Sequence, residues 1–195
     1  MLRLKNNISR TARNAGNGHN SFMILFTGLS GSGKSTLANL MEKELAGRNV
    51  KTYLLDGDIL RCGINKDLGF SEEDRTENLR RVAEISKLFV DAGMVVLAAF
   101  ISPLIKHREL IRHIVGSADY IEIYLSTPLE VCEKRDVKGL YAKARRGEIE
   151  NFTGISAPYE APASPDIKIN TAEKNTEDCI SEILSVIEKK LIVKK

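Results

Sequence analysis

The sequence has no tryptophan, few aromatic residues and little proline: of its 195 residues, 6% are aromatic and 5 are proline. It also has only 3 cysteines, Cys62, Cys132 and Cys179, which show no C-x-x-C spacing. Neither a disulfide framework nor a zinc site is therefore indicated, and we expect a reducing, cytoplasmic environment.

Long apolar runs and a strong charge of one sign are missing too. The longest apolar run extends from Met94 to Ile101, whereas a membrane-spanning helix needs about 20 apolar residues. The basic residues near the N-terminus precede no apolar segment, so no targeting signal is indicated. The 29 basic and 26 acidic residues leave a dispersed formal charge of +3. This composition indicates neither nucleic acid nor membrane binding, and we expect a soluble protein; small anionic ligands remain compatible with it.

The length and apolar content, 195 residues and 43%, suffice for one domain with a sizeable core. Residues 1–20 are polar and show no sustained periodicity, so we interpret them as a loosely attached arm. Residues 21–195 are expected to form a single domain.

From residue 22 onward, short apolar runs alternate with helical patterns. The expected strands are 22–26, 52–55, 95–101, 120–125 and 167–169. Helices are expected after the first strand, at 77–90 and 105–115, from residue 129, and at the C-terminus, where one stripe contains Ile180, Ile183, Leu184, Ile187 and Leu191. The alternation predicts an α/β fold: a five-stranded parallel sheet with helices on both faces and ligands at the carboxyl ends of the strands.

Residues 138–165 interrupt this alternation with a basic, glycine- and proline-containing stretch that we consider too polar for core. A solvated surface excursion is one interpretation. A long insertion beside a phosphate site is also typical of a closing lid. Given the motif described next, we expect a lid.

Residues 28–35 fit G-x-x-x-x-G-K-[ST] between an expected strand and an expected helix. In such a turn, glycines let consecutive backbone N–H groups face a polyphosphate, and the helix N-terminus adds partial positive charge. A flexible linker is the alternative, but it does not explain a lysine and a serine at fixed offsets after an apolar strand. The candidate ATP-binding residues are Gly28, Leu29, Ser30, Gly31, Ser32, Gly33, Lys34, Ser35 and Thr36.

The two polar residues that end the motif have separate expected roles. Lys34 bridges the outer phosphates of ATP and neutralises migrating charge, whereas the Ser35 hydroxyl is a ligand for Mg²⁺. The guanine-reading pattern Asn-Lys-x-Asp is missing. Together with the small size and the basic lid, this favours a small-molecule kinase over a GTPase or a motor.

Two carboxylates, Asp56 and Asp58, follow the second expected strand across a glycine. An ordinary Asp-Gly turn is the alternative, and for Asp56 alone it is equally favoured. A carboxylate at this edge can orient or deprotonate an attacking hydroxyl and hold magnesium through water. We therefore take Asp58 as the catalytic carboxylate and Asp56 as a substrate-binding residue.

The stretch from residue 55 to residue 81 resembles the adenylyl-sulfate kinase family. It contains Leu-Asp-Gly-Asp at 55–58, Asn-Lys-Asp-Leu-Gly-Phe-Ser at 65–71 and Asp-Arg-x-Glu-Asn-x-Arg-Arg at 74–81. Further matching blocks lie at 100–103, 138–141, 147–149, 151–154 and 158–162, so the resemblance extends from about Gly18 to the last helix. It implies a P-loop kinase fold and transfer of phosphate from ATP to the ribose 3′-hydroxyl of adenosine 5′-phosphosulfate. The products implied are ADP and 3′-phosphoadenosine 5′-phosphosulfate, in sulfate assimilation.

The resemblance also implies how the acceptor is recognised. Arg61 and Arg75 contact the phosphosulfate, for which guanidinium forks are suited. Phe70 and Phe152 sandwich the substrate adenine. The alternatives are surface ion pairs for the arginines and ordinary core for Phe70; core is less expected for Phe152, which lies in a polar segment.

The remaining candidate residues rest on the same resemblance. Asn78, Ile101, Lys138 and Asn151 complete the acceptor pocket, and Arg135 and Thr171 flank the ATP adenine. Ser102 stands where some relatives become phosphorylated and is a candidate catalytic and substrate-binding residue. The residues themselves favour a helix N-cap for Ser102, because Pro103 follows it before an expected helix.

The sequence departs from the family pattern at Ile59, Cys62, Ile105, Val137 and the pair Ser156-Ala157. These departures leave room for a kinase acting on another nucleotide with a sulfate-like end group. A non-catalytic ATP-binding regulatory subunit is a second alternative, which the retained Lys34, Ser35 and Asp58 disfavour. The resemblance further implies a homodimer, and docking of the N-terminal arm on a sulfurylase partner is an additional hypothesis.

Overall fold

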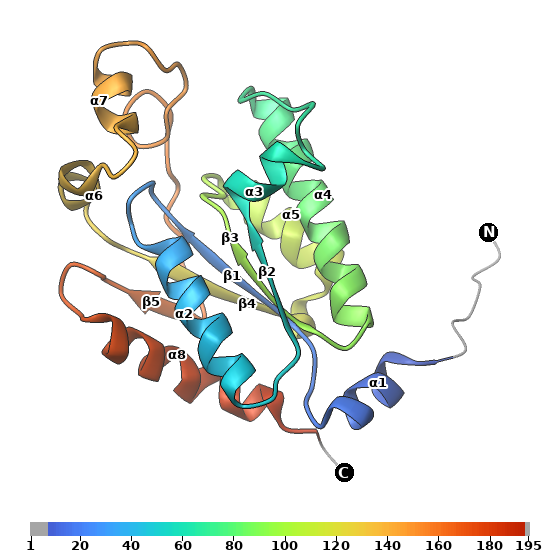
Figure 1. Cartoon of the computed structure of the whole chain (residues 1–195). Coiled ribbons are helices and arrows are strands. Elements are labelled where there is room, and N and C mark those ends of the chain that lie inside the picture. Colours follow the sequence, from blue (N-terminus) through green and yellow to red (C-terminus); the bar gives the residue numbers. More distant parts are fainter. Residues whose placement is uncertain (1–7, 194–195) are drawn as a thin grey trace.

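A computed structural model describes residues 8–193, which fold around a parallel sheet. The sheet is 5-stranded, in the order β2-β3-β1-β4-β5 (Figure 1). Its strands are β1 (Met23–Gly28), β2 (Thr52–Asp56), β3 (Val95–Ala99), β4 (Tyr120–Leu125) and β5 (Ile167–Ile169). The predicted fold class is confirmed, and each expected strand is present with shifts of one or two residues at its ends.

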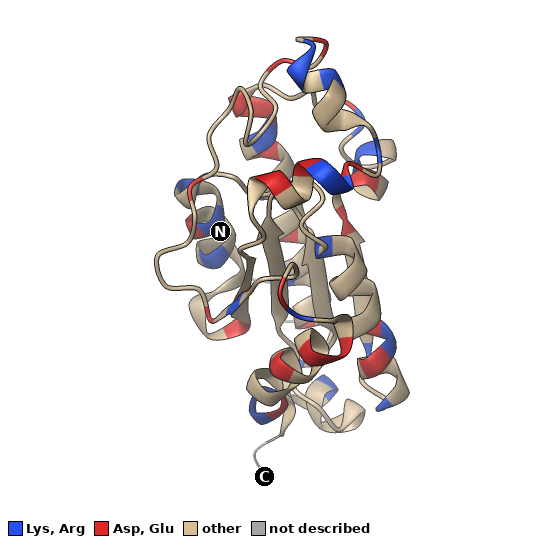
Figure 2. Ribbon diagram, turned by 90° about the vertical axis from the view of Figure 1, so that its left-hand side faces the viewer, with Lys and Arg blue, Asp and Glu red and all other residues tan. Residues whose placement is uncertain are grey.

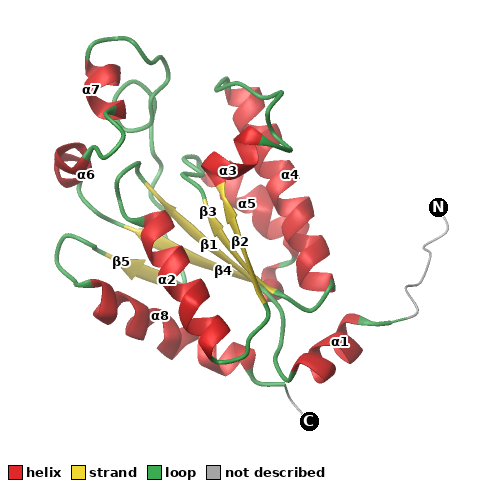
Figure 3. Cartoon of the chain, viewed as in Figure 1, coloured by secondary structure: helices red, strands yellow, loops and turns green. Residues whose placement is uncertain are grey.

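Helices alternate with these strands along the chain (Figure 3). They are α1 (Arg10–Asn17), α2 (Lys34–Gly47), α3 (Gly57–Cys62), α4 (Glu72–Asp91), α5 (Ile105–Val115), α6 (Leu129–Arg135), α7 (Leu140–Arg145) and α8 (Thr176–Leu191), with a 3₁₀ turn at Ser117–Asp119. The sequence did not predict α3 or α7, because each is too short to show a helical period. The helix α4 begins at Glu72, five residues before the expected start. Ser71 caps it, because its hydroxyl accepts a hydrogen bond from the Asp74 N–H.

The core lies on both faces of the sheet. On one face, Leu37, Met41 and Leu45 of α2 pack with the apolar stripe of α8 against β1, β3 and β4. On the other face, α4 and α5 cover Met23 and Leu25 of β1. Every residue of β1 and β3 is buried, as expected of central parallel strands covered on both sides. This packing places the carboxyl ends of the strands at one open edge.

The expectation of a loosely attached N-terminal arm is wrong for residues 8–20, while residues 1–7 lie outside the described residues. A helix, α1, begins after Ser9, whose side chain caps it. Arg10 pairs with Asp119 and donates to the Ser21 side chain, and Asn17 donates to the Gly93 carbonyl. Eight residues are too few to reveal periodicity in sequence, and these tertiary hydrogen bonds stabilise the helix.

Residues 138–165 leave the sheet and stand over its open edge together with α6 (Figure 1). The expectation that this stretch is too polar for core is wrong. Tyr141, Ala144 and Phe152 form a small buried cluster with Cys132 of α6. Residues 138–165, the expected lid, therefore have an apolar cluster of their own, which their charged composition did not predict.

Charged residues of both signs are spread over the helices, as Figure 2 shows, in agreement with the dispersed charge of the sequence. Among the described residues, no helix is both long and apolar enough to span a membrane.

Replacement of Ile183 by alanine should lower the free energy of unfolding by about 2–5 kcal/mol, because this fully buried side chain would leave a cavity between α8 and the sheet. Denaturant unfolding followed by circular dichroism measures the change. Val186→Ala is the matched control, since Val186 lies on the same helix and is 41% exposed. Equal losses for both variants would contradict the assigned faces of α8.

Candidate active site

A cavity of about 990 Å³ opens at the carboxyl edge of the sheet, between the strand ends and the lid. It brings together most of the residues that the sequence analysis selected. Those that line it are Ser30, Gly31, Gly33, Lys34, Ser35, Thr36, Asp56, Asp58, Arg61, Phe70, Arg75, Asn78, Ile101, Ser102, Arg135, Lys138, Phe152 and Thr171. The candidates Gly28, Leu29, Ser32 and Asn151 are not among the lining residues, although they belong to the backbone that shapes it.

The glycine-rich turn between β1 and α2 is tethered by its carbonyl groups. These carbonyls accept hydrogen bonds from side chains elsewhere in the fold: Leu29 from Lys34, Ser30 from the Tyr141 hydroxyl, Gly31 from Arg135, and Ser32 from Thr127 and Thr171. The Ser32 N–H donates to the Leu29 carbonyl at 3.2 Å, and the other N–H groups of the turn are the ones left for an anion.

Gly31 shows why this turn requires glycine. Its φ is 74°, and a Cβ atom there would lie 2.8 Å from the Cys132 carbonyl oxygen. Both the left-handed backbone and the close approach of α6 exclude a side chain. The helix α6 therefore packs directly against the glycine-rich turn.

Lys34 is 9% exposed and its ammonium donates to the Leu29 carbonyl at 2.7 Å. Burial lowers its pKa from 10.5 to about 8, although Cys132, Asp56 and Asp58 oppose that shift. A buried ammonium of this kind is held by a single carbonyl and lacks a direct carboxylate contact in the described chain. An entering phosphate would supply the missing negative charge.

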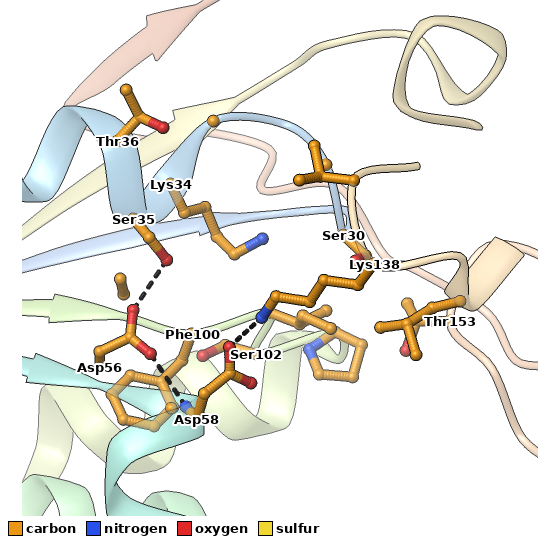
Figure 4. Close-up of a pocket in the computed structure, with 18 of the residues that line it drawn as sticks. Ser30, Lys34, Ser35, Thr36, Asp56, Asp58, Phe100, Ser102, Lys138 and Thr153 are labelled. Atoms are coloured by element: carbon orange, nitrogen blue, oxygen red, sulfur yellow. Dashed lines mark hydrogen bonds and ion pairs between the residues drawn. The ribbon is translucent and has the colours of Figure 1, made fainter. Parts of the chain in front are cut away.

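Ser35, Asp56 and Asp58 form a connected row across the cavity floor (Figure 4). The Ser35 hydroxyl donates to Asp56 Oδ2 at 2.7 Å, and the Asp58 N–H donates to Asp56 Oδ1 at 2.9 Å. Asp56 thus caps α3, which explains how the sequence places Asp58 in the first turn of that helix. The hydroxyl and carboxylate oxygens of Ser35 and Asp56 are the hard oxygen donors that Mg²⁺ prefers, so these residues fit the ion.

Lys138 reaches from the lid to Asp58, and the two side chains form an ion pair (Figure 4). They come from segments 80 residues apart in the chain. Asp58 is mostly exposed to the cavity, so solvent screens the pair and it contributes little to stability. The pair does place a cationic lid residue at the proposed catalytic carboxylate.

Arg61 and Arg75 both approach Phe70. Their guanidinium carbons lie 4.3 Å and 5.9 Å from the centroid of its ring. Burial lowers the pKa of Arg75, and the nearby charge of Arg61 lowers it further. Neither arginine has a carboxylate partner in the described part of the chain; both donate to backbone carbonyls instead. Two unneutralised guanidinium groups that face one cavity form a site for an anionic group.

The two phenylalanines differ in exposure. Phe70 is 60% exposed, so it is not the core residue that was the alternative for it. Phe152 is 9% exposed and meets Tyr141 edge to face, with 5.0 Å between ring centroids. The expectation that Phe152 is not core is wrong, because the lid has its own apolar cluster. Both rings still line the cavity.

Arg75 connects residues 138–165 to the part of the cavity that contains Arg61 and Phe70. Its guanidinium donates to the Asn151 carbonyl at 2.8 Å and to the Thr153 hydroxyl at 3.3 Å. Asn151 has a φ of 53°, a left-handed conformation that asparagine tolerates. Asn151 thus contributes its backbone oxygen to this contact.

Asn78 lies behind the arginines and is 5% exposed. Its amide oxygen accepts a hydrogen bond at 2.9 Å from Asn65, which is fully buried. This places Asn65 as a support for Asn78. The sequence analysis quoted Asn65 within a motif but did not select it.

The prediction that Ser102 caps the following helix is wrong. The helix α5 begins at Ile105, its N-cap is Leu104, and the Ile105 N–H donates instead to the Glu160 carboxylate at 2.7 Å. Ser102 has a φ of 43° and is 2% exposed, and its hydroxyl has no hydrogen-bond partner in the described residues. It lies in the loop after β3, because that strand ends at Ala99.

Arg135 and Thr171 both line the cavity and contact each other. Arg135 donates to the Thr171 hydroxyl and to its carbonyl, each at 2.8 Å. The Thr171 hydroxyl donates in turn to the Ser32 carbonyl at 2.9 Å. These candidates for the ATP adenine therefore also tether the glycine-rich turn.

The sequence did not predict several side chains that bind the backbone or side chains of the candidate site residues. Tyr141 and Thr127 bind carbonyls of the turn, Thr153 contacts Arg75, and Arg108 and Glu160 bind the Ser102 loop. Tyr141 and Glu160 lie in blocks that carried the family resemblance, which was the available signal. Thr127 and Arg108 carried none.

The departures from the family pattern are at the surface. Ile59, Ile105 and Val137 are 69%, 43% and 91% exposed, and Cys62 is exposed as well. Of these, Val137 borders the cavity. The other departures are not among the residues that line the cavity, although the Ser156 hydroxyl accepts a hydrogen bond from the N–H of Phe152, which does line it.

The chain is similar to several known proteins. A family model described as adenylylsulphate kinase matches residues 20–170. The adenylyl-sulfate kinase of Bacteroides thetaiotaomicron is 56% identical over 170 residues, covering 87% of this chain and 85% of that protein. That of Acaryochloris marina is 51% identical over 189 residues, covering 97% and 92%.

Solved structures give the same result. The Mycobacterium tuberculosis APS kinase CysC, in complex with AMPPNP and APS, superposes with a TM-score of 0.84 at 47% identity, covering 87% of this chain and 98% of that chain. A hexameric APS kinase from Thiobacillus denitrificans has a TM-score of 0.67 at 26% identity, covering 91% of this chain and 31% of that chain.

Binding of a triphosphate nucleotide should be accompanied by proton uptake near pH 8–9. The pKa of Lys34 is about 8 in the free protein, and a phosphate beside it raises that pKa. Affinity should therefore be constant below about pH 8 and fall as pH rises above the free-state pKa. Calorimetric titration with a non-hydrolysable ATP analogue, in buffers of different ionisation enthalpy, measures the uptake.

Lys43→Met is the matched control for Lys34→Met in this titration, because Lys43 lies on the same helix outside the cavity. Lys34→Met should remove the uptake and Lys43→Met should retain it. Uptake that persists in Lys34→Met would assign the proton to another group.

Proposed function

The chain belongs to the adenylyl-sulfate kinase family, and we propose that the residues of its cavity transfer the γ-phosphoryl group of ATP to the ribose 3′-hydroxyl of adenosine 5′-phosphosulfate. The products are ADP and 3′-phosphoadenosine 5′-phosphosulfate. The observation that carries this proposal is a single cavity with the phosphate-binding turn on one side, unneutralised Arg61 and Arg75 on the other, and Asp58 between them.

On the donor side, the N–H groups of residues 28–36 bind the phosphates of ATP. Lys34 exchanges the Leu29 carbonyl for phosphate oxygens, which offset the cost of burying its charge. Ser35 and Asp56 would hold Mg²⁺, which neutralises phosphate charge when it is bound. Arg135 and Thr171 flank the adenine of ATP.

On the acceptor side, the phosphosulfate lies against Arg61 and Arg75, and the adenine lies between Phe70 and Phe152. Asn78, Ile101, Ser102 and the backbone of Asn151 complete the wall. Thr153 keeps Arg75 in place through its hydroxyl. These assignments use the unpaired guanidinium groups, the exposed face of Phe70 and the packing of the lid.

The transfer is an in-line displacement. Asp58 accepts a hydrogen bond from the 3′-hydroxyl and takes its proton as that oxygen bonds to the γ-phosphorus, while the bond from this phosphorus to the bridging oxygen of ADP breaks. In the structure, Lys138 forms an ion pair with Asp58, so the incoming 3′-hydroxyl displaces the Lys138 ammonium from that carboxylate. The freed ammonium then stabilises the negative charge of the phosphoryl group that is being transferred. The lid residues exclude water.

From the sequence, we also propose that the protein forms a homodimer, that it is cytoplasmic, and that residues 1–20 dock on a sulfurylase partner. The hydrogen bonds of α1 to the body bear on the last proposal, since Arg10 and Asn17 are engaged with this chain. Deletion of residues 1–7 alone would leave those bonds intact and test docking.

A panel of nucleotides incubated with labelled ATP should show phosphorylation of adenosine 5′-phosphosulfate at its 3′-hydroxyl in preference to other acceptors. Lys34→Ala should abolish turnover with all of them, because no cation then bridges the outer phosphates. Preferential labelling of an acceptor without an end group like phosphosulfate would refute the substrate. Absence of any ADP release in the presence of Mg²⁺ would refute the activity itself.

Asp58→Asn should lower kcat by about a hundredfold or more while changing the KM for the acceptor much less, because the amide can still accept a hydrogen bond but cannot take a proton. Steady-state assays of both substrates measure the split. Asp91→Asn, at the exposed end of α4, is the control for the chemical change. Retention of full kcat in Asp58→Asn would mean that another group accepts the proton.

A further inference from the structure

The loop from Ile101 to Pro103 is held through its backbone. Ile101 and Ser102 of this loop form part of the cavity wall on the acceptor side. Its consecutive carbonyl groups accept hydrogen bonds from different parts of the fold: Ile101 from the Thr27 hydroxyl of β1 at 2.7 Å, Ser102 from an Arg108 nitrogen of α5 at 2.7 Å, and Pro103 from the Glu160 N–H of the lid at 2.8 Å.

These hydrogen bonds explain the unusual backbone conformation of Ser102. A residue other than glycine with a φ of 43° is in a sparsely populated conformation, which persists only where surrounding contacts determine it. The hydrogen bonds to the carbonyls on either side of Ser102 supply such contacts. The buried position of the Ser102 hydroxyl therefore depends on groups outside the cavity.

Arg108 binds this loop and the lid at the same time. One terminal nitrogen of its guanidinium donates to the Ser102 carbonyl, and the other donates to the Glu160 carbonyl at 2.6 Å. The remaining nitrogen lies 2.9 Å from Glu122 of β4, and both side chains are buried, at 4% and 7% exposure. The planar guanidinium of Arg108, whose charge is balanced by Glu122, therefore joins the backbone at Ser102 to the backbone at Glu160.

Glu160 completes the connection from the side of the lid. Its N–H binds the Pro103 carbonyl, and its carboxylate accepts from the Ile105 N–H at 2.7 Å, which caps α5. The preceding residue, Tyr159, has its hydroxyl 2.9 Å from the Thr27 hydroxyl, the same group that binds Ile101. The point where the lid rejoins the body is therefore fastened to the acceptor wall.

We propose that Arg108 and Glu160 are positioning residues that connect the root of the lid to the Ile101–Pro103 loop and so determine how well the acceptor nucleotide binds, independently of ATP. Neither residue lines the cavity. The proposal rests on the proposed function, because it names the residues that shape the acceptor half of that site.

Arg108→Lys is the first test. Lysine keeps a positive charge opposite Glu122 but cannot donate to both carbonyls in the same fixed geometry. The KM for adenosine 5′-phosphosulfate should rise about tenfold, the cost of a hydrogen bond from a charged donor, while the KM for ATP stays within about twofold. Loss of folded protein would instead lower kcat and leave both KM values unchanged.

Arg112→Lys is the matched control. Arg112 lies one turn further along α5 and also faces Glu122, at 3.6 Å, but it binds neither Ser102 nor the lid. Both KM values should be unaltered in this variant. A rise in the acceptor KM for Arg112→Lys equal to that for Arg108→Lys would overturn the proposal, because it would trace the effect to Glu122 alone.

Glu160 offers a second test that leaves the buried ion pair intact. Glu160→Ala removes the acceptor of the Ile105 N–H, whereas Glu160→Gln retains an oxygen there. The acceptor KM should rise in the first variant and remain near the wild-type value in the second. If neither Arg108→Lys nor Glu160→Ala raises it, or if either raises the ATP KM by the same factor, the proposal is wrong.

Hydrogen exchange separates failure of this inference from failure of the proposed function, because it needs no substrate. Amides of residues 104–107 and 159–161 should exchange faster in Arg108→Lys than in the wild type or in Arg112→Lys. Unchanged exchange would overturn the connection even in an active kinase. A wild-type protein that does not phosphorylate adenosine 5′-phosphosulfate would refute the function and leave the exchange result to be judged by itself.

Discussion

The tethering of one strand-to-helix turn is the constraint on which this site depends. The carbonyls of residues 29–32 are held by side chains of α2, α6, α7 and the loops after β4 and β5. These bonds hold the backbone of the turn in place, so that its remaining amide groups could bind an anion without rearrangement. The same tethers attach the lid to the turn, so the donor site and the lid are parts of one hydrogen-bonded unit.

The proposed acceptor half of the cavity follows a different principle, since its two arginines have no direct carboxylate partner among the described residues. Arg61 and Arg75 both contact the ring of Phe70. They donate hydrogen bonds only to carbonyl groups and to one hydroxyl. Keeping like charges close costs free energy, which a phosphosulfate would recover on binding. Lys138 and Asp58, by contrast, form an ion pair with each other.

Much of this arrangement was predictable from sequence where the signal is local. A few consecutive residues suffice to predict each of the following features: the strands β1 to β5, the glycine-rich turn, and the pair Asp56 and Asp58. The helix cap expected of Ser102 and the non-core position expected of Phe152 were wrong, because distant residues decide both. Glu160, 58 positions beyond Ser102, caps the helix that Ser102 was expected to cap, and Tyr141 with Cys132 makes Phe152 part of a core.

By itself, the sequence determined the alternation of strands and helices, the phosphate-binding turn and the family to which the chain belongs, because each of these is written in short-range periodicity and contiguous motifs. Only the tertiary structure decided which side chains hold the turn, how α1 attaches, and how Arg108 and Glu160 join the lid to the acceptor wall. Those contacts link residues far apart in the chain, and their free energy arises from burial and hydrogen-bond geometry that exist only once the sheet has brought them together.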